Sequence, residues 1–164
     1  MDIRLAHAGD WPAIWPFLRA IVTARETYAY DPEMSEDEAR ALWMVPPPAR
    51  VVVAVADAGA IVGTANMYAN RPGPGAHVAS ASFMVDPAHH GRGIGRALGE
   101  DMIAWARGAG FRAIQFNAVV ETNERAVRLW RSLGFATIGT VPEAFLHPRH
   151  GYVGLHVMHR PLDD

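Results

Sequence analysis

The sequence predicts a single α/β domain with a mixed β-sheet over residues 1–164. Short β-rich runs alternate with segments of helical periodicity along the whole chain, which is typical of this fold class. Half of the residues are hydrophobic and one fifth are charged, a balance that suits one core in a chain of this length. A glycine cluster lies between a predicted strand and a predicted helix.

The first 50 residues are predicted to form one strand and two helices. Residues 3–5 form a short strand, and apolar residues between positions 8 and 25 recur with helical spacing. Residues 35–38, Ser-Glu-Asp-Glu, form a capping box that begins a second helix, which runs to about Met44. The prolines at 46–48 end this helix because proline removes a backbone donor and clashes with the preceding turn.

The middle of the chain is predicted to be strand-rich. Residues 51–56 and 61–68 are β-rich runs joined by the short turn 57–59, which indicates a hairpin. A further strand runs from His77 to Val85 and ends at the Asp-Pro pair that follows.

The last 70 residues are predicted to continue as helix, strand, helix and two strands. A helix follows the glycine cluster and ends near residue 108, and residues 113–120 form a strand. Asn123 caps a helix that ends at Gly134, with Arg125, Arg128 and Arg131 on its solvated side. The final strands are expected at 136–141 and 152–159, with a loop over the residues between them.

Composition excludes several kinds of chemistry. The chain has no cysteine, so disulfides, thiolate nucleophiles and cysteine-based zinc sites are excluded. All 15 basic residues are arginine, so a Schiff-base lysine and the lysine of a phosphate-binding P-loop are excluded too. The net charge of −2 with no basic run argues against a nucleic-acid binder. With no apolar run near the roughly 20 residues of a membrane helix, and no signal-peptide pattern, we expect a cytoplasmic protein with no membrane partner.

The glycine cluster His90-Gly91-Arg92-Gly93-Ile94-Gly95 is predicted to bind phosphate groups. Alternating glycines between a strand and a helix let several backbone N–H groups converge at a helix N-terminus, where the macrodipole favours an anion. Arg92 and Arg96 would add charge-assisted contacts. A closely packed turn without a ligand is the alternative for so short a motif.

Spacing narrows the choice of phosphate ligand. The dinucleotide fingerprint needs a further glycine three residues after the second, but Arg96 or Leu98 stands there. A P-loop needs the missing lysine. Coenzyme A carries a pyrophosphate and a long pantetheine arm that could pair with a strand edge, so it is consistent with the pattern.

Two segments resemble one known family. Residues 85–98 are similar to the acetyl-CoA signature of the GCN5-related N-acetyltransferases, and Asn123 to Trp130, followed by Leu133-Gly134-Phe135, resembles their second conserved segment. The resemblance spans nearly the whole chain. It implies a largely antiparallel sheet flanked by about four helices, with two strands splayed into a V that receives acetyl-CoA as co-substrate.

The resemblance also implies which residues bind the cofactor. Met84 and Val85 would pair with the pantetheine arm through their main chains, His90 to Arg96 would bind the pyrophosphate, and Asn123 would contact the CoA arm. Two positions depart from the family. His90 replaces the usual Gln or Arg, and Trp130 replaces a Tyr that protonates the leaving thiolate in many members. Because an indole N–H is not a usable acid, we expect Trp130 to pack in the core.

Four polar residues are candidates for the acceptor site. Asn117, the candidate catalytic residue, interrupts an apolar strand, so its side chain is expected either to face a pocket or to be hydrogen-bonded in the core. Asn117 and Ser80 also match positions of the fungal acetyltransferases that detoxify proline analogues, a weaker resemblance. Tyr28 and Tyr30 stand where the family builds its acceptor pocket and would bind substrate or form a lid.

Other side chains give weaker signals. Three carboxylates, Glu26, Glu121 and Glu143, are candidate proton acceptors, but solvated or capping roles are more usual for Glu, so no general base is predicted. The pairs His89-His90 and His147/His150 lack converging carboxylates, so no metal site is expected.

The predicted function is acetyl transfer from acetyl-CoA to the amine of a small molecule, such as an amino acid or a toxic analogue, by direct attack. A protein or peptide N-terminal acetyltransferase and a non-catalytic acyl-CoA-binding module are the alternatives. The apolar run from Val153 to Met158 suggests a homodimer contact. The sequence does not identify the amine, because acceptor pockets are built from variable loops.

Overall fold

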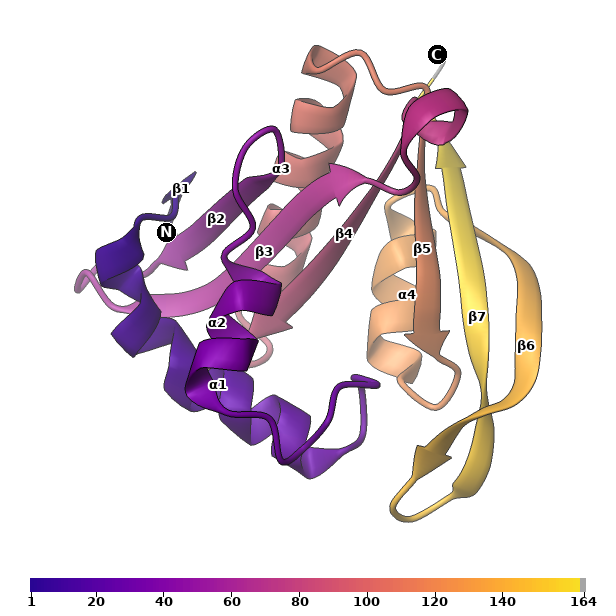
Figure 1. The fold of residues 1–164 in the computed structure, drawn as a ribbon, viewed down its shortest axis with the longest axis horizontal. Coiled ribbons are helices and arrows are strands. Elements are labelled where there is room, and N and C mark those ends of the chain that lie inside the picture. Colours follow the sequence, from indigo (N-terminus) through magenta and orange to yellow (C-terminus); the bar gives the residue numbers. More distant parts are fainter. Residues whose placement is uncertain (163–164) are drawn as a thin grey trace.

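The computed structural model describes residues 1–162 and contains one seven-stranded sheet with helices on both faces (Figure 1). The strands follow the spatial order β1-β2-β3-β4-β5-β7-β6. Their bounds are β1 (Asp2–Leu5), β2 (Arg50–Val55), β3 (Ile61–Ala69), β4 (Val78–Val85), β5 (Ala113–Val120), β6 (Ala136–His147) and β7 (Gly151–Pro161). Every neighbouring pair is antiparallel except β4 and β5, which are parallel, so the predicted mixed, largely antiparallel fold is confirmed.

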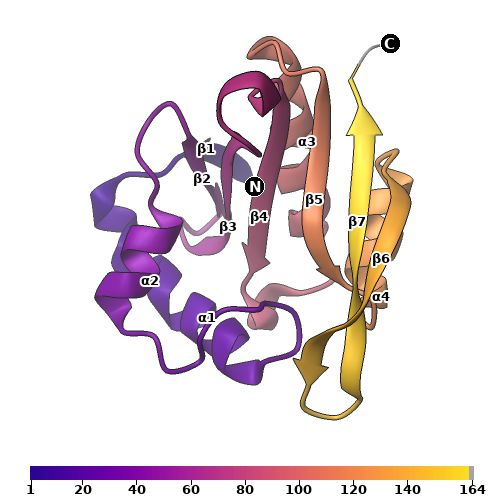
Figure 2. The ribbon, with the colours of Figure 1, turned by 45° about the vertical axis from the view of Figure 1, so that its right-hand side comes forward.

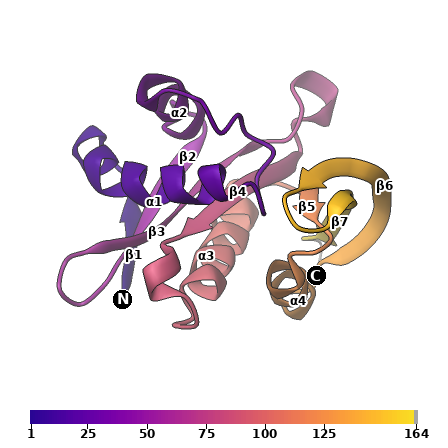
Figure 3. The same cartoon turned by 90° about the horizontal axis from the view of Figure 1, so that it is seen from below.

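Within the described residues, four α-helices cover the sheet in two pairs. Helices α1 (Trp11–Ala24) and α2 (Glu36–Trp43) lie on one face, and α3 (Ile94–Gly108) and α4 (Glu124–Ser132) lie on the other (Figure 3). The predicted capping box is present at α2, where the Ser35 side chain accepts from the Glu38 amide and the Glu38 carboxylate accepts from the Ser35 amide. None of the helices within residues 1–162 is both long and apolar enough to cross a bilayer.

The central strands are buried on both faces because helices cover each side. In β2, Val52 and Ala54 pack toward α3 and α4, whereas Val51 and Val53 pack toward α1 and α2. Helices α3 and α4 approach closely at Gly99, where a Cβ would lie 2.7 Å from a Leu133 side-chain atom and 3.0 Å from Trp130. This close approach fixes the position of Trp130 beside β4 and β5.

The strand prediction was wrong at the C-terminus. Residues 142–147 were expected in a loop, but β6 continues to His147 and only residues 148–150 connect it to β7. β6 is the edge of the sheet, and an edge strand tolerates Pro142 because its missing N–H is not needed by a second neighbour. The register shifts between Val141 and Phe145, and Glu143 adopts a φ of 52°, so the extra residues are taken up by a bulge.

The two halves of the sheet separate along the β4–β5 boundary. Only Val78 pairs with Ala113 and Ala79 with Ile114, after which the two strands diverge (Figure 2). The loop that follows α1 lies at the open end of this V. The predicted splay is therefore present, and it places unpaired strand edges opposite one another.

Candidate functional site

The glycine loop forms an open nest of main-chain amides. Gly91 and Gly93 have φ values of 82° and 78°, a left-handed conformation that glycine adopts without strain. α3 begins at Ile94, immediately after them, so the amides at the N-terminus of this helix point away from its hydrogen-bonded turns.

Hydrogen bonding within the loop shows which amides are available to a ligand. The amides of Ala88, His89 and His90 are bonded inside the turn, His90 by a long 3.4 Å contact to the Pro87 carbonyl. The Ala97 amide bonds to the Gly93 carbonyl. Between these positions, no hydrogen bond within residues 1–162 occupies the amides of residues 91–96. This stretch is therefore the part of the loop that fits a pyrophosphate.

The edge of β4 supplies a second set of polar groups. The carbonyl of His77 accepts from Arg112 at the start of β5, whereas the carbonyl of Val78 accepts from Asn70 beyond β3. Because main-chain direction alternates along a strand, Phe83 and Val85 direct their N–H and C=O groups into the gap, and Met84 directs its own toward β3. The main-chain pairing expected of Met84 and Val85 therefore fits Val85 but not Met84, whose groups are directed to β3 within the sheet. Phe83 faces the same gap, which sequence reasoning missed, and its N–H and C=O bond there to the Tyr28 hydroxyl.

A cleft of about 430 Å³ joins the amide nest to the β4 edge. Its lining includes all the predicted cofactor residues except Arg92, namely Met84, Val85, His90, Gly91, Gly93, Ile94, Gly95, Arg96 and Asn123. Asn123 also caps α4 by accepting from the Ala126 amide. The cleft has the shape and donors that a pyrophosphate with a long arm requires.

Arg125 also lines this cleft, although it was expected on the solvated side of α4. Its guanidinium lies 3.9 Å from the position of a Cβ on Gly91. The helical spacing placed it correctly on the exposed face, but only the fold shows that this face borders the glycine loop. Arg125 therefore gives the nest a positive charge. Arg96 also lines the cleft, but its guanidinium donates to Ser132 at 2.7 Å and to Glu100 at 3.5 Å.

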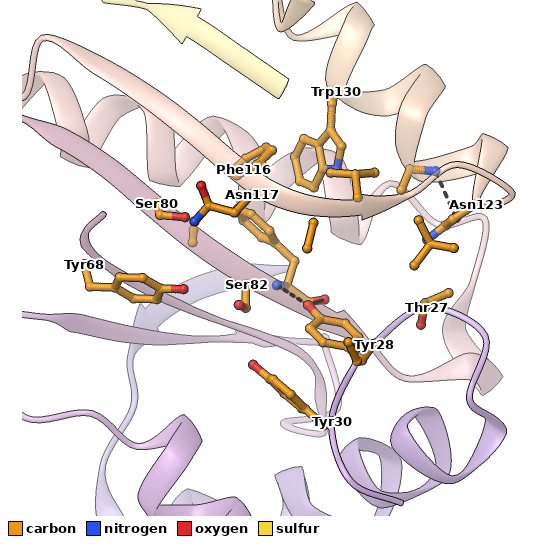
Figure 4. Close-up of a pocket in the computed structure, with 17 residues that line it drawn as sticks. Thr27, Tyr28, Tyr30, Tyr68, Ser80, Ser82, Phe116, Asn117, Asn123 and Trp130 are labelled. Atoms are coloured by element: carbon orange, nitrogen blue, oxygen red, sulfur yellow. Dashed lines mark hydrogen bonds between the residues drawn. The ribbon is translucent and has the colours of Figure 1, made fainter. Parts of the chain in front are cut away.

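A second cavity of about 280 Å³ lies beside the first, deeper in the V (Figure 4). The structure brings together in its wall all four predicted acceptor-site residues, Tyr28, Tyr30, Ser80 and Asn117. Sequence reasoning missed Tyr68 and Ser82, which line the same space. Ser82 follows Ser80 at the two-residue spacing that places side chains on one face of a strand, a signal that the sequence did contain.

The amide of Asn117 is held by two neighbours. Its oxygen accepts from Gln115 at 2.9 Å, and its nitrogen donates to the Asn70 side-chain oxygen at 2.6 Å. The register of β5 against β7 shifts between Phe116 and Val119, so a bulge surrounds this residue. Bulges re-aim side chains, which agrees with the position of Asn117 in the cavity wall beside Ser80 (Figure 4). Of the two sequence-based alternatives, a pocket or a hydrogen-bonded place in the core, the structure supports the pocket, because Asn117 is exposed and its hydrogen bonds lie outside the core.

The hydroxyls of Tyr28 and Tyr30 in this cavity are protonated at neutral pH. Burial raises the pKa of Tyr28, whose hydroxyl bonds to the main chain of Phe83. Burial also raises the pKa of Tyr30, with hydrogen bonding to Ser82 opposing the effect. Neither group is a base at neutral pH. Figure 4 shows the hydroxyls of Tyr30, Tyr68 and Ser82 pointing into the same space.

Trp130 packs in the core, as expected, and also borders both cavities. It is 6% exposed and contacts the rings of Phe83, Phe116 and Phe135 at centroid distances of 4.7, 4.8 and 5.9 Å. It lines the cofactor cleft and the acceptor cavity. Its indole forms an apolar wall at the junction of the two spaces.

The other candidates that the sequence offered lie outside the lining of both cavities, except His89 and His90, which line the cofactor cleft; those outside are Glu26, Glu121, Glu143, His147 and His150. Glu26 forms an ion pair with Arg149 at 2.7 Å, and Glu121 accepts from the Gly154 amide. The rings of His147 and His150 lie 4.5 Å apart, but within residues 1–162 no three His, Asp or Glu side chains converge on a point that could hold a metal.

The chain belongs to the acetyltransferase (GNAT) family, whose model matches residues 15–135. The N-acetyltransferase aca1 of Schizosaccharomyces pombe is 34% identical over 98 residues, which cover 59% of this chain and 47% of that relative. The chain therefore matches about half the length of this curated relative.

Solved structures match over nearly the full length. A GCN5-related N-acetyltransferase from Kribbella flavida is 68% identical with a TM-score of 0.95, over 98% of this chain and 96% of that one. The putative acetyltransferase yncA from Salmonella typhimurium, solved with acetyl-CoA, is 28% identical with a TM-score of 0.83, over 100% and 95%. A phosphinothricin acetyltransferase from Sinorhizobium meliloti, in complex with acetyl-CoA, is 26% identical with a TM-score of 0.86, over 98% and 87%. The family and fold expected from the sequence are thus confirmed.

Proposed function

We propose that the chain transfers an acetyl group from acetyl-CoA to the amine of a small molecule. The open amides of residues 91–96 would hold the pyrophosphate, and the β4 edge would pair with the pantetheine arm. Two structural relatives that contain acetyl-CoA support this choice of co-substrate. No metal takes part in the proposed reaction.

The observation that carries this proposal is the meeting of the two cavities. Six residues line both of them, namely Thr27, Tyr28, Phe83, Asn123, Ala126 and Trp130. A thioester reaching the inner end of the cofactor cleft would therefore face a nucleophile held in the second cavity. This arrangement supplies the proximity on which a reaction between two bound molecules depends.

The residues available at the junction favour direct transfer of the acetyl group from the thioester to the amine. The neutral amine nitrogen attacks the thioester carbonyl, the carbon–nitrogen bond forms and the carbon–sulfur bond breaks, and CoA leaves as a thiolate that takes up a proton. The surplus proton of the new amide passes to water. No cysteine or lysine is present to form an acyl-enzyme, so positioning by Asn117, Ser80 and the tyrosines supplies the chain's contribution.

The size of the acceptor cavity supports a small molecule over a protein. About 280 Å³ is below the usual range of drug-sized ligand sites. The ion pair of Glu26 with Arg149 also links the loop after α1 to the β6–β7 hairpin, and thereby borders the open end of the V. A peptide acceptor would need a groove that runs past this link.

An acetyl-CoA thiol-release assay tests the proposal. Free thiol should appear only when an amine is added, and the acetylated amine should form in equal amount. A panel of amino acids, proline analogues, phosphinothricin-like compounds, polyamines, aminoglycosides and N-terminal peptides covers the proposed substrates and the peptide alternative. Tight acetyl-CoA binding without turnover of any amine would favour a non-catalytic acyl-CoA-binding module.

We also propose a homodimer and a cytoplasmic location. β7 is paired on both sides, so its run from Val153 to Met158 is not an available edge. The exposed apolar residues of the β6–β7 hairpin, Ile138, Val141, Leu146 and Tyr152, support a contact through β6 instead. Light scattering at several concentrations tests the dimer, and cell fractionation tests the location.

A further inference from the structure

Among residues 1–162, the wall of the acceptor cavity contains no charged side chain. The 17 described residues that line it provide hydroxyls, the side-chain amides of Asn117 and Asn123, and apolar groups, but no Asp, Glu, Lys, Arg or His side chain. Burial raises the pKa of Tyr28 and Tyr30, so these two hydroxyls stay uncharged at neutral pH.

Several charged or titratable groups on the segments that border the cavity have partners of their own. On its outer side, Glu26 pairs with Arg149 of the hairpin, and beyond the end of β5 Glu121 accepts from the Gly154 amide of β7. On β7, the His156 ring bonds to Thr140. The arginine of α4 nearest the site, Arg125, borders the cofactor cleft and not the acceptor cavity.

This lining has a first consequence for charge. Moving an ammonium or a carboxylate from water into a site without a counter-ion is unfavourable, because the lost hydration is not replaced by an ion pair. Neutral hydrogen-bonding groups do find partners here, in the Asn117 amide and the hydroxyls of Ser80, Ser82 and Tyr68. The cavity therefore favours an acceptor that is uncharged and polar.

A second consequence concerns the proton that an ammonium must lose before its nitrogen can attack. With no carboxylate or histidine in the wall, no side chain can remove a proton from a bound ammonium, so the amine must enter already neutral. The neutral fraction at pH 7 rises as the amine pKa falls, while nucleophilicity declines more slowly. The same trade-off in thiols places the best nucleophile at a pKa near the ambient pH.

We propose that the acceptor is a small, weakly basic amine whose remaining groups are neutral, of the α-amino amide type, and that free amino acids and strongly basic alkyl amines are poor acceptors. This inference rests on the proposed acetyl transfer. An α-amine next to an amide has a pKa of about 7.7–8.0, against about 10.4 for an alkyl ammonium. In a free amino acid the neighbouring carboxylate both raises the amine pKa and brings a negative charge that the cavity does not match.

Three acceptors of similar size provide the test: alaninamide, alanine and isobutylamine. The full-length protein is assayed with saturating acetyl-CoA from pH 6 to 9, and acetylated product is measured. At pH 7 we expect kcat/KM for alaninamide to exceed the other two values by about 10-fold or more, as the neutral fractions require. For alaninamide kcat/KM should rise with pH and level off near the pKa of its amine, whereas for alanine and isobutylamine, whose amine pKa values are higher, it should still be rising at pH 9, since the described cavity wall contains no carboxylate or histidine.

The outcomes separate this inference from the proposed function. If alanine or isobutylamine reacts as fast as alaninamide at pH 7, the enzyme is an N-acetyltransferase but the neutral-acceptor inference is overturned. A breakpoint that stays at one pH for all three acceptors also overturns it, because it reveals a base in the protein. If no amine of any kind is acetylated, the proposed function fails and the inference with it.

A matched pair of variants at Ser82 gives an independent readout. Ser82→Asp adds a carboxylate to the cavity, whereas Ser82→Asn adds a neutral group of the same size. The ratio of kcat/KM for isobutylamine to that for alaninamide should rise about 10-fold in the Asp variant relative to the Asn variant, because only the carboxylate pairs with an ammonium. Equal ratios in the two variants would show that charge in this cavity does not govern selection.

Discussion

The hydroxyl of Tyr28 bonds to both main-chain groups of Phe83. It donates to the Phe83 carbonyl at 2.6 Å and accepts from the Phe83 amide at 2.8 Å (Figure 4). Phe83 lies where β4 has already separated from β5, so a neighbouring strand does not supply these bonds. One side chain from the loop after α1 thus completes the edge of the strand at the junction of the two cavities.

Replacing this hydroxyl should lower stability and change the response to the cofactor. In Tyr28→Phe, two main-chain groups lose their partner at a partly buried position, which we expect to cost about 1 kcal/mol of unfolding free energy. If the cofactor arm runs along this edge, acetyl-CoA can restore a bond to Phe83, so its binding should raise the Tm of the variant by more than it raises that of the wild type. Thermal unfolding with and without acetyl-CoA measures both effects.

Tyr30→Phe is the matched control, because Tyr30 contacts Tyr28 with a centroid distance of 5.1 Å and its hydroxyl lies near Ser82 instead of the Phe83 main chain. Its Tm should change little, and its response to acetyl-CoA should match the wild type. Equal stabilisation of both variants by acetyl-CoA would contradict a cofactor path along Phe83.

Local signals predicted much of this arrangement, but the junction itself depends on long-range contacts. The strand–glycine–helix order and the caps at Ser35 and Asn123 are determined by neighbouring residues, and the structure has them as expected. The bond between Tyr28 and Phe83 joins residues 55 positions apart. Nothing in the local pattern of either segment indicates it.

The same reason explains the two residues whose surroundings were missed. Arg125 is on the polar side of an amphipathic helix, and only the packing of α4 beside the glycine loop makes that side part of a cleft. Pro142 signals a break in most strands, but as a member of the edge strand β6 it needs no second partner. In both cases the local sequence pattern is as expected. The position of the segment in the fold determines what the residue contacts.

The amide nest predicts a charge-specific effect at Gly93. Gly93 lines the cofactor cleft, has a φ of 78°, and an added Cβ meets no atom within 4 Å. Gly93→Asp should therefore fold, since Asp tolerates left-handed φ, but its carboxylate would repel the pyrophosphate. We expect acetyl-CoA affinity to fall about 100-fold or more by calorimetry, in line with like charges near a protein surface.

Gly59→Asp controls for backbone strain. Gly59 lies in the turn between β2 and β3, has a φ of 81°, and also leaves room for a Cβ. Both variants should lose similar small amounts of stability, but only Gly93→Asp should lose acetyl-CoA. Unchanged affinity in Gly93→Asp would remove the glycine loop from the cofactor site.

Asp10 should make stability depend on pH in the acid range. Its buried carboxylate accepts two 2.8 Å bonds from Arg4 and one from the His7 amide, and the hydrogen bond with Arg4 is the main reason why its pKa is lowered. Because the folded pKa lies below the unfolded one, this contribution is complete above the unfolded pKa of about 3.9 and is lost as pH falls through the folded value. Wild-type Tm should therefore fall more steeply below pH 4 than the Tm of Asp10→Asn.

At pH 7 Asp10→Asn should be less stable than the wild type, since the Arg4 ion pair is lost. Glu33→Gln, which removes an exposed carboxylate, should follow the wild-type curve. Parallel pH curves for Asp10→Asn and wild type would show that Asp10 titrates normally in the folded protein.

The bonds around Asn117 predict a graded effect on turnover. Asn117→Ala removes a cavity-facing amide, so kcat/KM for the amine should fall about 10-fold while acetyl-CoA affinity changes little, in keeping with the loss of a positioning hydrogen bond. Asn70 acts through Asn117, because its side-chain oxygen accepts from the Asn117 nitrogen at 2.6 Å. Asn70→Ala should therefore raise KM for the amine by a smaller factor. Asn70→Asp keeps an acceptor at the same place and should restore most of the loss, whereas a merely structural role of Asn70 would lower the Tm of both variants and leave KM unchanged in each.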